Sequence, residues 1–269
     1  MKLSIITINR NNADGLRKTI ESVVSQSFND FEYIVIDGAS IDSSVEVIKE
    51  YQDKITYWVS EPDSGVYQAM NKGIRQVKGD YILFLNSGDF LIGSDVLDRV
   101  MSQSKGADVL CARCNVSDKG NVVWTSNPPE QITVGVLYGV GLAHQSTFIK
   151  RELFEKHGLY REDFKYNSDI DFWYRTIIFG GASTQKIDVI TTDYNLDGIS
   201  SKQNESQQYK AEMEEILSHP FLRKVLPDYE CMRQERERLR VMMWVKSKSF
   251  LYKPLSCLYN ISSLLKKKD

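Results

Sequence analysis

The strongest constraint on the fold is a regular alternation of short apolar strands with amphipathic helices over residues 2–86. The helical stretches place apolar residues at three-and-four spacing, and Gly79 is expected to end the third of them as its C-cap. This alternation predicts an α/β fold, a doubly wound and mainly parallel sheet flanked by helices. The expected strands span 2–8, 31–37, 55–60 and 80–86, and the helices 16–26, 43–51 and 66–77.

After residue 94 the pattern loosens, although strands and helices are still expected. From residue 201 the chain turns charged and helical, and Pro220, Pro227 and Pro254 are expected to break it into short helices. The later expected helices span 94–103, 167–180 and a short stretch from 151, and the later strands 107–117, 121–126, 143–150 and 186–196.

Composition excludes several classes of protein. Of 269 residues, 42% are hydrophobic and 26% charged, which is typical of globular chains and not of disordered or fibrous ones. No apolar run reaches the roughly 18 to 20 residues that span a bilayer. The N-terminus turns polar too early for a secretory signal, so a cytoplasmic protein is expected. Four cysteines do not indicate a disulfide framework.

Known catalytic and cofactor motifs are missing. The first strand is followed by neither G-x-G-x-x-G nor a Walker A lysine motif, which argues against dinucleotide and P-loop chemistry. Cys111 and Cys114 form a single C-x-x-C, which we interpret as cysteines on a strand because zinc needs a second pair. The three histidines occur in no H-E-x-x-H, and no G-x-S-x-G is present.

Polar residues cluster where the predicted strands end. Each could be an ordinary turn residue, but the carboxyl ends of parallel strands meet at one edge, where ligands bind. Carboxylates there suit Mg²⁺ or Mn²⁺ shared with phosphates, which favours a nucleotide-diphosphate ligand. These residues are Asn9, Arg10, Asp37, Asp63, Asn86 and Asp89.

Five segments in order resemble family 2 glycosyltransferases of the GT-A fold: SIITINRN, DGASIDSS, SEPDSGVYQAMNKGI, GDYILFLNSGD and SDIDFWYR. The resemblance covers residues 2 to 200. It implies a GT-A (Rossmann-like) catalytic domain over 1–200, with a nucleotide-binding half at 1–93 and an acceptor half at 94–200. Residues 201–269 are then a C-terminal helical extension with a basic amphipathic tail.

The implied reaction is inverting transfer of a hexosyl or N-acetylhexosaminyl group to an acceptor hydroxyl. The donor is a nucleotide diphosphate sugar, with a UDP-sugar favoured, and the pathway a bacterial-type surface polysaccharide or glycan synthesis. Asp37 would read the base, whereas Asp42 is interpreted as a helix N-cap. Lys72 could instead be a solvated helix lysine. The residues implied to bind the donor are Thr7, Asn9, Arg10, Asp37, Asp63, Asn71, Lys72 and Asn86.

The segment LNSGD stands where the family has a D-x-D motif and departs from it. Asn86 takes the first acidic position and Gly88 the second, so the charge is kept only at Asp89. A carboxylate holds a hard cation better than an amide does. We therefore assign Asp89 to a Mn²⁺ or Mg²⁺ ion, with Asn86 assisting at the ribose or phosphate.

SDIDFWYR resembles the family's E-D motif, with Ser168 in place of the Glu. The resemblance makes Asp169 the general base that takes the acceptor proton. Asp171 lies two residues on, faces away, and is expected to pair with Arg175. Two further residues are candidates for acceptor contact, with a core position as the alternative: His144 and Trp173.

The last 40 residues differ in charge from the rest. Residues 230–269 carry 10 Lys/Arg and 4 Asp/Glu, whereas the other 229 residues carry 24 and 32. The tail could lie on the inner face of an anionic membrane, which suits a lipid-linked glycan acceptor, or could pack on the domain. Nucleic acid is not an expected partner.

Two other functions compete with glycosyl transfer. One is a non-catalytic module that binds a nucleotide sugar or glycan on the same fold, which the departures at Asn86 and Ser168 motivate. The other is nucleotidyl transfer, which usually brings a Gly-rich basic loop after the first strand. INRNNADG is a poor match to such a loop.

Overall fold

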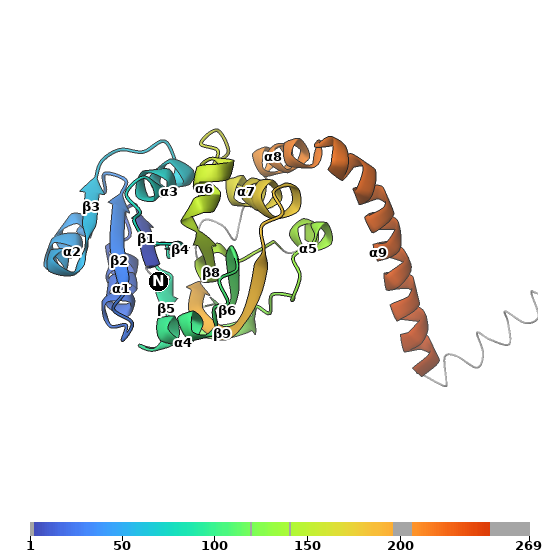
Figure 1. The fold of residues 1–269 in the computed structure, drawn as a ribbon, viewed down its shortest axis with the longest axis horizontal. Helices are drawn as coiled ribbons and strands as arrows, with labels where there is room; N and C mark the ends of the chain where they lie inside the picture. Colours follow the sequence, from blue (N-terminus) through green and yellow to red (C-terminus); the bar gives the residue numbers. More distant parts are fainter. Residues whose placement is uncertain (1–2, 119, 140, 196–205, 248–269) are drawn as a thin grey trace, which may run out of the picture. The chain divides into compact units, whose positions relative to one another are not determined.

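A computed structural model describes residues 3–118, 120–139, 141–195 and 206–247 (Figure 1). The strands are β1 Leu3–Asn9, β2 Phe31–Asp37, β3 Tyr57–Ser60, β4 Tyr81–Phe84, β5 Phe90–Leu91, β6 Val109–Asp118, β7 Asn121–Thr125, β8 Thr147–Lys150 and β9 Thr184–Asn195. The helices are α1 Ala13–Val24, α2 Ser44–Glu50, α3 Val66–Ile74, α4 Val96–Gln103, α5 Val134–Gly139, α6 Arg151–His157, α7 Ser168–Trp173, α8 Gln207–Leu217 and α9 Pro220–Ser247. Single helical turns occur at Gln52–Lys54, His144–Ser146 and Tyr174–Phe179.

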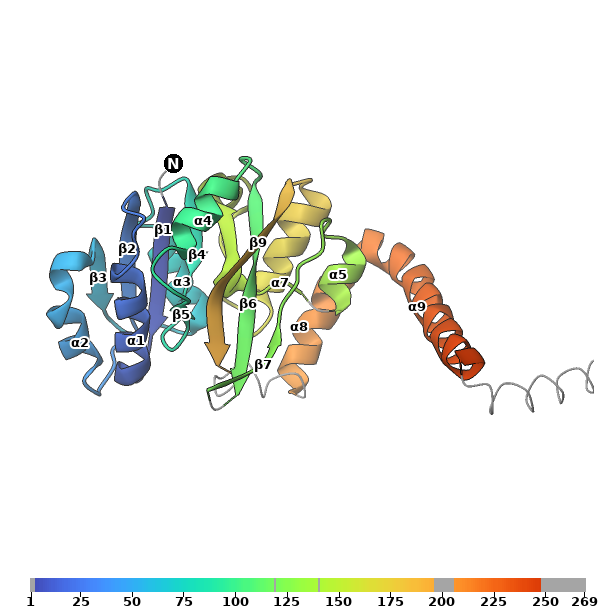
Figure 2. The ribbon, with the colours of Figure 1, turned by 90° about the horizontal axis from the view of Figure 1, so that it is seen from below.

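The strands described form one nine-stranded sheet in the order β3-β2-β1-β4-β8-β6-β9-β5, with β7 paired to β6. The pairs among β1, β2, β3 and β4 are parallel, and so is β6–β9. Strand β8 runs antiparallel to its neighbours β4 and β6, while β5 and β7 are antiparallel to β9 and β6. Figure 2 shows β6 beside β9 and β7 beside β6. The prediction of a mainly parallel α/β sheet flanked by helices is confirmed.

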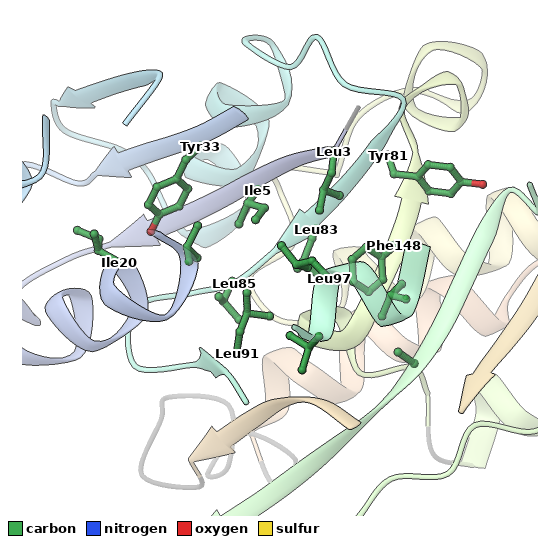
Figure 3. Packing of buried hydrophobic residues seen from close by; sticks show 14 of the residues in the cluster. Leu3, Ile5, Ile20, Tyr33, Tyr81, Leu83, Leu85, Leu91, Leu97 and Phe148 are labelled. Carbon is green, nitrogen blue, oxygen red and sulfur yellow. The ribbon is translucent and has the colours of Figure 1, made fainter. Parts of the chain in front are cut away.

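Alternating residues of the central strands face two helical layers. Ile5 and Leu83 pack with α1, α2 and α4, as Figure 3 shows for part of that core. On the opposite face, Gly73 of α3 lies against Ile6, and Phe84 contacts Phe154 of α6. Apolar burial of this kind stabilises the sheet by about 1.5–3 kcal/mol for each large side chain.

Register brings polar strand ends together at one edge of the sheet. Asn9, the last residue of β1, lies opposite Asp37, the last residue of β2. Ser60, the last residue of β3, lies opposite Asp37 on its other side. The expectation that these strand ends share one edge of the sheet is therefore confirmed.

Two expectations about helix ends are wrong. Helix α3 ends at Ile74 with Arg75 as its C-cap, not at Gly79. Gly79 is instead required by close approach, because a Cβ there would lie 2.8 Å from the backbone nitrogen of Ser4. Pro227 lies inside the 28-residue helix α9 and does not break it. Pro254 lies outside the described residues.

Asp42 accepts hydrogen bonds at two helix starts, but the N-cap residues there are Ser43 and Asn12, so its interpretation as an N-cap is wrong by one position for α2. Its Oδ1 accepts a hydrogen bond from the Ser44 backbone nitrogen at 3.0 Å, at the first residue of α2. Its Oδ2 accepts one from the Ala13 nitrogen at 3.0 Å, at the first residue of α1. Free N–H groups at helix starts are satisfied in this way.

The chain divides into two compact units, Met1–Glu214 and Glu215–Asp269. The expected division at residue 200 into a catalytic domain and a helical extension stays a prediction, since residues 196–205 are outside the described part. None of the described helices is long and apolar enough to cross a membrane.

Candidate active site

A buried carboxylate organises the edge formed by β1, β2 and β3. Asp37 is fully buried, and its Oδ1 accepts hydrogen bonds from Asn9 Nδ2 at 2.7 Å and Ser40 Oγ at 2.6 Å. Its Oδ2 accepts from Ser60 Oγ at 2.6 Å and from the Ser40 nitrogen at 2.9 Å. A buried charge needs such partners. This network fixes the loop after β2, at the place where the sequence predicts base recognition.

Arg10 and Asp63 lie over Gly38, the residue that follows Asp37. A Cβ at Gly38 would lie 2.5 Å from Asp63 Oδ2 and 3.4 Å from Arg10 Cδ. A Cβ at Gly38 would therefore fit only if the Asp63 side chain moved aside. The arrangement brings the exposed Arg10 and the half-buried Asp63 together at the edge of the sheet. A cation and a carboxylate at this place can address a nucleoside and its phosphates.

Three other predicted donor residues have protein partners. Thr7 is buried and donates to the Leu85 carbonyl at 2.8 Å. Asn71 is buried and bonds the backbone of Tyr160, donating to its carbonyl at 2.9 Å and accepting from its nitrogen at 3.1 Å. Lys72 pairs with Glu61 at 2.9 Å. Asn71 thus fixes α3 to the 160–162 segment, and direct donor contact by these three residues stays a prediction.

The turn after β4 connects to the proposed base through a histidine. Asn86 Nδ2 lies 3.2 Å from His144 Nε2, and His144 Nδ1 lies 3.9 Å from Asp169 Oδ2. Burial lowers the pKa of His144, while the charge of Asp169 acts in the opposite direction. The structure thus places Asn86, His144 and Asp169 in one row, from the end of β4 to the start of α7.

Tyr67 of α3 holds the other oxygen of Asp169. Its hydroxyl lies 2.9 Å from Asp169 Oδ1 and 2.7 Å from the Tyr166 carbonyl, and its hydrogen is shared between these acceptors. Burial and the charge of Asp169 raise the pKa of Tyr67 well above its usual value, so the phenol remains a donor. The Asp169 side chain keeps 20% of its surface exposed and can meet a substrate.

Asp89 forms a further carboxylate site, which is more buried than that of Asp169. A tight turn positions it, closed by a hydrogen bond from its nitrogen to the Asn86 carbonyl at 2.9 Å, with Gly88 at φ 106°. Asp89 is 8% exposed, and burial together with the charge of Asp193 raises its pKa to about 8. Asp193 lies on β9, opposite Phe90 of β5. Two neighbouring carboxylates, one of which resists ionisation, are a suitable donor set for a hard cation.

The start of α7 is fixed by contacts that the sequence predicted in part. The expected pair is present, with Arg175 Nε 2.7 Å from Asp171 Oδ2. Ser168, which replaces the family's Glu, is buried and accepts a hydrogen bond from the Arg161 nitrogen. Trp173 is 0% exposed and its ring centroid lies 5.7 Å from that of Phe172. Such burial is that of a core aromatic and leaves no ring face for a sugar.

Sequence reasoning missed three residues of this site. Tyr67 lies within a segment that resembles the family, but nothing local shows that its hydroxyl reaches Asp169. Asp193 lies in a polar stretch of the sequence, and its pairing with β5 could not be foreseen. Glu212 of α8, which binds the backbone just before α7, carries no signal in the sequence.

Comparison with known proteins identifies the family. The sequence model of "Glycosyl transferase family 2" matches residues 4–173. An "Uncharacterized glycosyltransferase" of Mycobacterium tuberculosis strain H37Rv is 30% identical over 218 residues, covering 76% of this chain and 79% of the relative. A "PGL/p-HBAD biosynthesis glycosyltransferase" of Mycobacterium bovis BCG is 27% identical over 198 residues, covering 71% and 76%. The chain belongs to glycosyl transferase family 2 and is a glycosyltransferase.

Solved structures share the fold of this chain. Staphylococcus aureus TarS residues 1–349 in complex with UDP superposes with a TM-score of 0.61 at 19% identity, over 72% of this chain and 60% of that one. The mannosyltransferase PcManGT of Pyrobaculum calidifontis, in complex with GDP-Man and Mn²⁺, gives 0.54 at 15% identity, over 70% and 56%. The chain thus spans about 60% of the TarS chain, and these likenesses show the fold.

Proposed function

We propose that this chain is an inverting glycosyltransferase in which Asp169 is the general base. The observation that carries the proposal is the row from Asn86 through His144 to Asp169, which leads from the edge of the sheet proposed to bind the nucleotide to a partly exposed carboxylate. A base that faces the donor edge can take a proton from a nucleophile as it attacks the sugar. The buried Asp37 network, and the position of Arg10 and Asp63 beside Gly38, support donor binding at that edge.

The proposed step is a single displacement at the anomeric carbon of the donor. The acceptor oxygen forms the new bond to that carbon, and its proton passes to an oxygen of Asp169. The bond from the anomeric carbon to the phosphate oxygen breaks, and the nucleoside diphosphate leaves with the electron pair. Attack opposite the leaving group inverts the configuration. Tyr67 keeps Asp169 Oδ1 oriented throughout, which favours the geometry needed for proton transfer.

The proposed donor is a nucleoside diphosphate sugar, with uridine favoured, that carries a hexosyl or N-acetylhexosaminyl group. TarS, a relative in fold, has been solved with UDP and with UDP-GlcNAc, whereas PcManGT has been solved with GDP-Man. Thr7, Asn9, Arg10 and Asp37 are the residues that we propose for the nucleoside. Asn71 and Lys72 of α3 bond to other residues of this chain. Their proposed contribution is to hold α3 in place beside the donor.

A divalent cation, Mn²⁺ or Mg²⁺, fits the carboxylates of Asp89 and Asp193. Both are oxygen donors, and a cation would favour the ionised form of an acid whose pKa is raised to about 8, as that of Asp89 is. The described residues contain no group of three or more His, Cys, Asp or Glu that could hold a metal, so the diphosphate would supply further ligands. When bound, the cation offsets the negative charge of the leaving diphosphate.

For the acceptor we propose a glycan or lipid-linked glycan in a bacterial-type surface polysaccharide or glycan pathway. A related chain is named for PGL/p-HBAD biosynthesis, which is a property of that protein. The basic tail supports contact with the inner face of a membrane, because α9 exposes Met232, Leu239, Met243 and Trp244 beside a run of basic residues. The tail beyond residue 247 lies outside the described residues.

The first test is a thermal-shift panel of UDP, GDP, dTDP and their common sugars, with and without Mn²⁺. The wild type is compared with Asp89→Ala and with Asp53→Ala, a control that removes an exposed carboxylate. A ligand at one hundred times its dissociation constant stabilises by about 2.7 kcal/mol. We expect one nucleotide to stabilise the wild type and the control with metal, and the Asp89→Ala protein much less.

The second test separates an enzyme from a binding module. Asp169→Asn should keep the nucleotide shift and lose release of nucleoside diphosphate from the sugar donor that stabilises the protein most. Full turnover by Asp169→Asn would contradict the base assignment. Donor stabilisation without any turnover by the wild type, with or without glycan acceptors, would favour the non-catalytic module.

A further inference from the structure

The carboxylate of Glu212 in α8 binds the backbone segment that leads into the proposed base. Glu212 is 5% exposed. Its Oε1 accepts a hydrogen bond from the Lys165 nitrogen at 2.7 Å, and its Oε2 accepts from the nitrogens of Tyr166 and Asn167, each at 3.0 Å. The side chain of Asn167 also donates to Oε2 at 3.3 Å. Three successive N–H groups therefore converge on one buried anion.

Glu212 binds the segment that precedes α7, whose first helical residue is Ser168. Asn167 occupies the N-cap position, but its side chain donates to the Tyr209 carbonyl and to Glu212 and makes no cap hydrogen bond. The free N–H groups that precede the helix are satisfied by a residue 45 positions further along the chain. Hydrogen bonds from N–H groups to a carboxylate are stronger than those between neutral groups. The conformation of 165–167 therefore depends on α8.

A second contact of α8 lies on the same side of the site. Tyr209, one helical turn before Glu212, has its ring 6.5 Å from that of Tyr166. The charge of Asp169 contributes to the raised pKa of Tyr209, after burial, which places the phenol within electrostatic reach of the proposed base. Asp169 follows Asn167 by two residues. The family match ends at residue 173, so α8 lies beyond the part of the chain that the family describes.

We propose that α8 belongs to the catalytic machinery, with Glu212 as a positioning residue that fixes the 165–167 segment and thereby the orientation of Asp169. The inference rests on the proposed role of Asp169. Glu212 does not touch the reacting atoms, and it acts through the backbone that carries the base. A displacement of the base by about 1 Å is enough to cost roughly 100-fold in rate.

The experiment compares Glu212→Gln and Glu212→Ala with Glu214→Gln in the full chain. Glu214 is exposed on the same helix and is the matched control for loss of a carboxylate. Gln keeps the shape of Glu but turns one oxygen into an N–H₂ group that faces N–H donors. The probe is the nucleotide sugar from the thermal-shift panel that stabilises the wild type most. The rate is the release of its nucleoside diphosphate, measured well below the melting temperature of each variant.

We expect Glu212→Gln to lower kcat by roughly 10- to 100-fold and Glu212→Ala by more, with donor KM within about twofold of wild type. Hydrogen exchange should rise in peptides covering 165–169 and stay unchanged in those covering β1 and β2. Glu214→Gln should match wild type in both. If Glu212→Ala fails to fold, Glu212→Gln alone carries the test.

Two outcomes would overturn the inference. In one, Glu212→Gln melts at a lower temperature but keeps wild-type kcat, which is what a purely structural contact predicts. In the other, exchange at 165–169 does not change. A failure of the proposed function gives a different result, because Asp169→Asn would then retain turnover. Loss of turnover in Asp169→Asn with wild-type kcat in Glu212→Gln rejects the role of Glu212 alone.

Discussion

Two side chains from distant elements lie beside the carboxylate of the proposed base, Tyr67 through a hydrogen bond of 2.9 Å and His144 at 3.9 Å, and neither relation could be predicted from the sequence. Tyr67 of α3 and His144 lie 102 and 25 positions before Asp169 and address different oxygens of its carboxylate. The resemblance placed Asp169 correctly at the start of a helix, because the segment around it is local. These relations depend on how α3 and the 144–146 turn pack, which no local pattern encodes.

Removing the Tyr67 hydroxyl tests one of these relations. Tyr67→Phe keeps a ring that packs 5.6 Å from Tyr160 but removes the hydrogen bond to Asp169. A hydrogen bond to a charged group contributes about 1.5–3 kcal/mol, so we expect kcat to fall roughly 10- to 100-fold. Nucleotide stabilisation in a thermal-shift assay should be unchanged. Wild-type kcat in Tyr67→Phe would show that the phenol does not orient the base.

The lowered pKa of His144 predicts how stability depends on pH. In the unfolded chain a histidine takes up its proton near pH 6.5, whereas the buried imidazole does so only at lower pH. The unfolded state therefore binds more protons as pH falls below about 6.5, and the free energy of unfolding decreases there. Above that pH the histidine is neutral in both states, and its contribution is constant.

The measurement is the melting temperature of wild type and His144→Gln from about pH 8 to about pH 5, on either side of the ordinary histidine pKa. The difference between the two proteins should be constant above about pH 7 and should move in favour of His144→Gln below about pH 6.5. The pKa of His157 is also lowered, but this residue is present in both proteins and cancels. Parallel curves across the whole range would mean that the imidazole of His144 is not buried as it is in the structure.

At the scale of elements, local patterns predicted most helices and strands of the N-terminal half. They failed where tertiary contacts determine whether a helix or strand forms. Strand β2 has the predicted bounds, Phe31–Asp37, because an apolar run followed by Asp-Gly is a local signal. The π-helical turn Tyr174–Phe179 and the two-residue strand β5 carry no such signal. Pro227 removes one N–H donor from α9, yet the helix continues through it, which the residue type alone argues against.

Gly79 shows how a residue interpreted as a helix end serves the packing of strands. A Cβ there would lie 2.8 Å from the Ser4 nitrogen and 2.9 Å from the Leu3 carbonyl carbon, both in the backbone of β1. A strand in the middle of a sheet cannot move aside cheaply. We expect Gly79→Ala to lower the free energy of unfolding by about 1–3 kcal/mol, the usual cost of overpacking.

Urea denaturation of Gly79→Ala beside Gly139→Ala measures this cost. Gly139 ends α5, and a Cβ added there would meet no atom within 4 Å, so its substitution should change stability little. Equal stability of the two variants would mean that β1 and the turn before β4 are further apart than the structure places them.

At the scale of the whole molecule, charge separates the tail from the rest of the chain. The last 40 residues hold 10 basic and 4 acidic residues, whereas the remainder has an excess of acid, 32 against 24. Each Lys or Arg near an anionic membrane contributes about 1 kcal/mol of attraction. The acidic remainder would be repelled by the same surface, so we expect any membrane contact to be made by the tail and not by the rest of the chain.

The last prediction concerns a protein that lacks residues 246–269, a segment with six lysines. We expect this protein to keep its nucleotide-dependent thermal shift, because the proposed donor residues all precede residue 90. Its sedimentation with vesicles containing anionic lipid should fall strongly, while wild-type binding should weaken as salt rises. The variant Lys266→Gln/Lys267→Gln/Lys268→Gln, which keeps the apolar residues, should fall between the two. Equal vesicle binding by wild type and truncated protein would reject membrane contact through the tail and favour an extension that packs on protein.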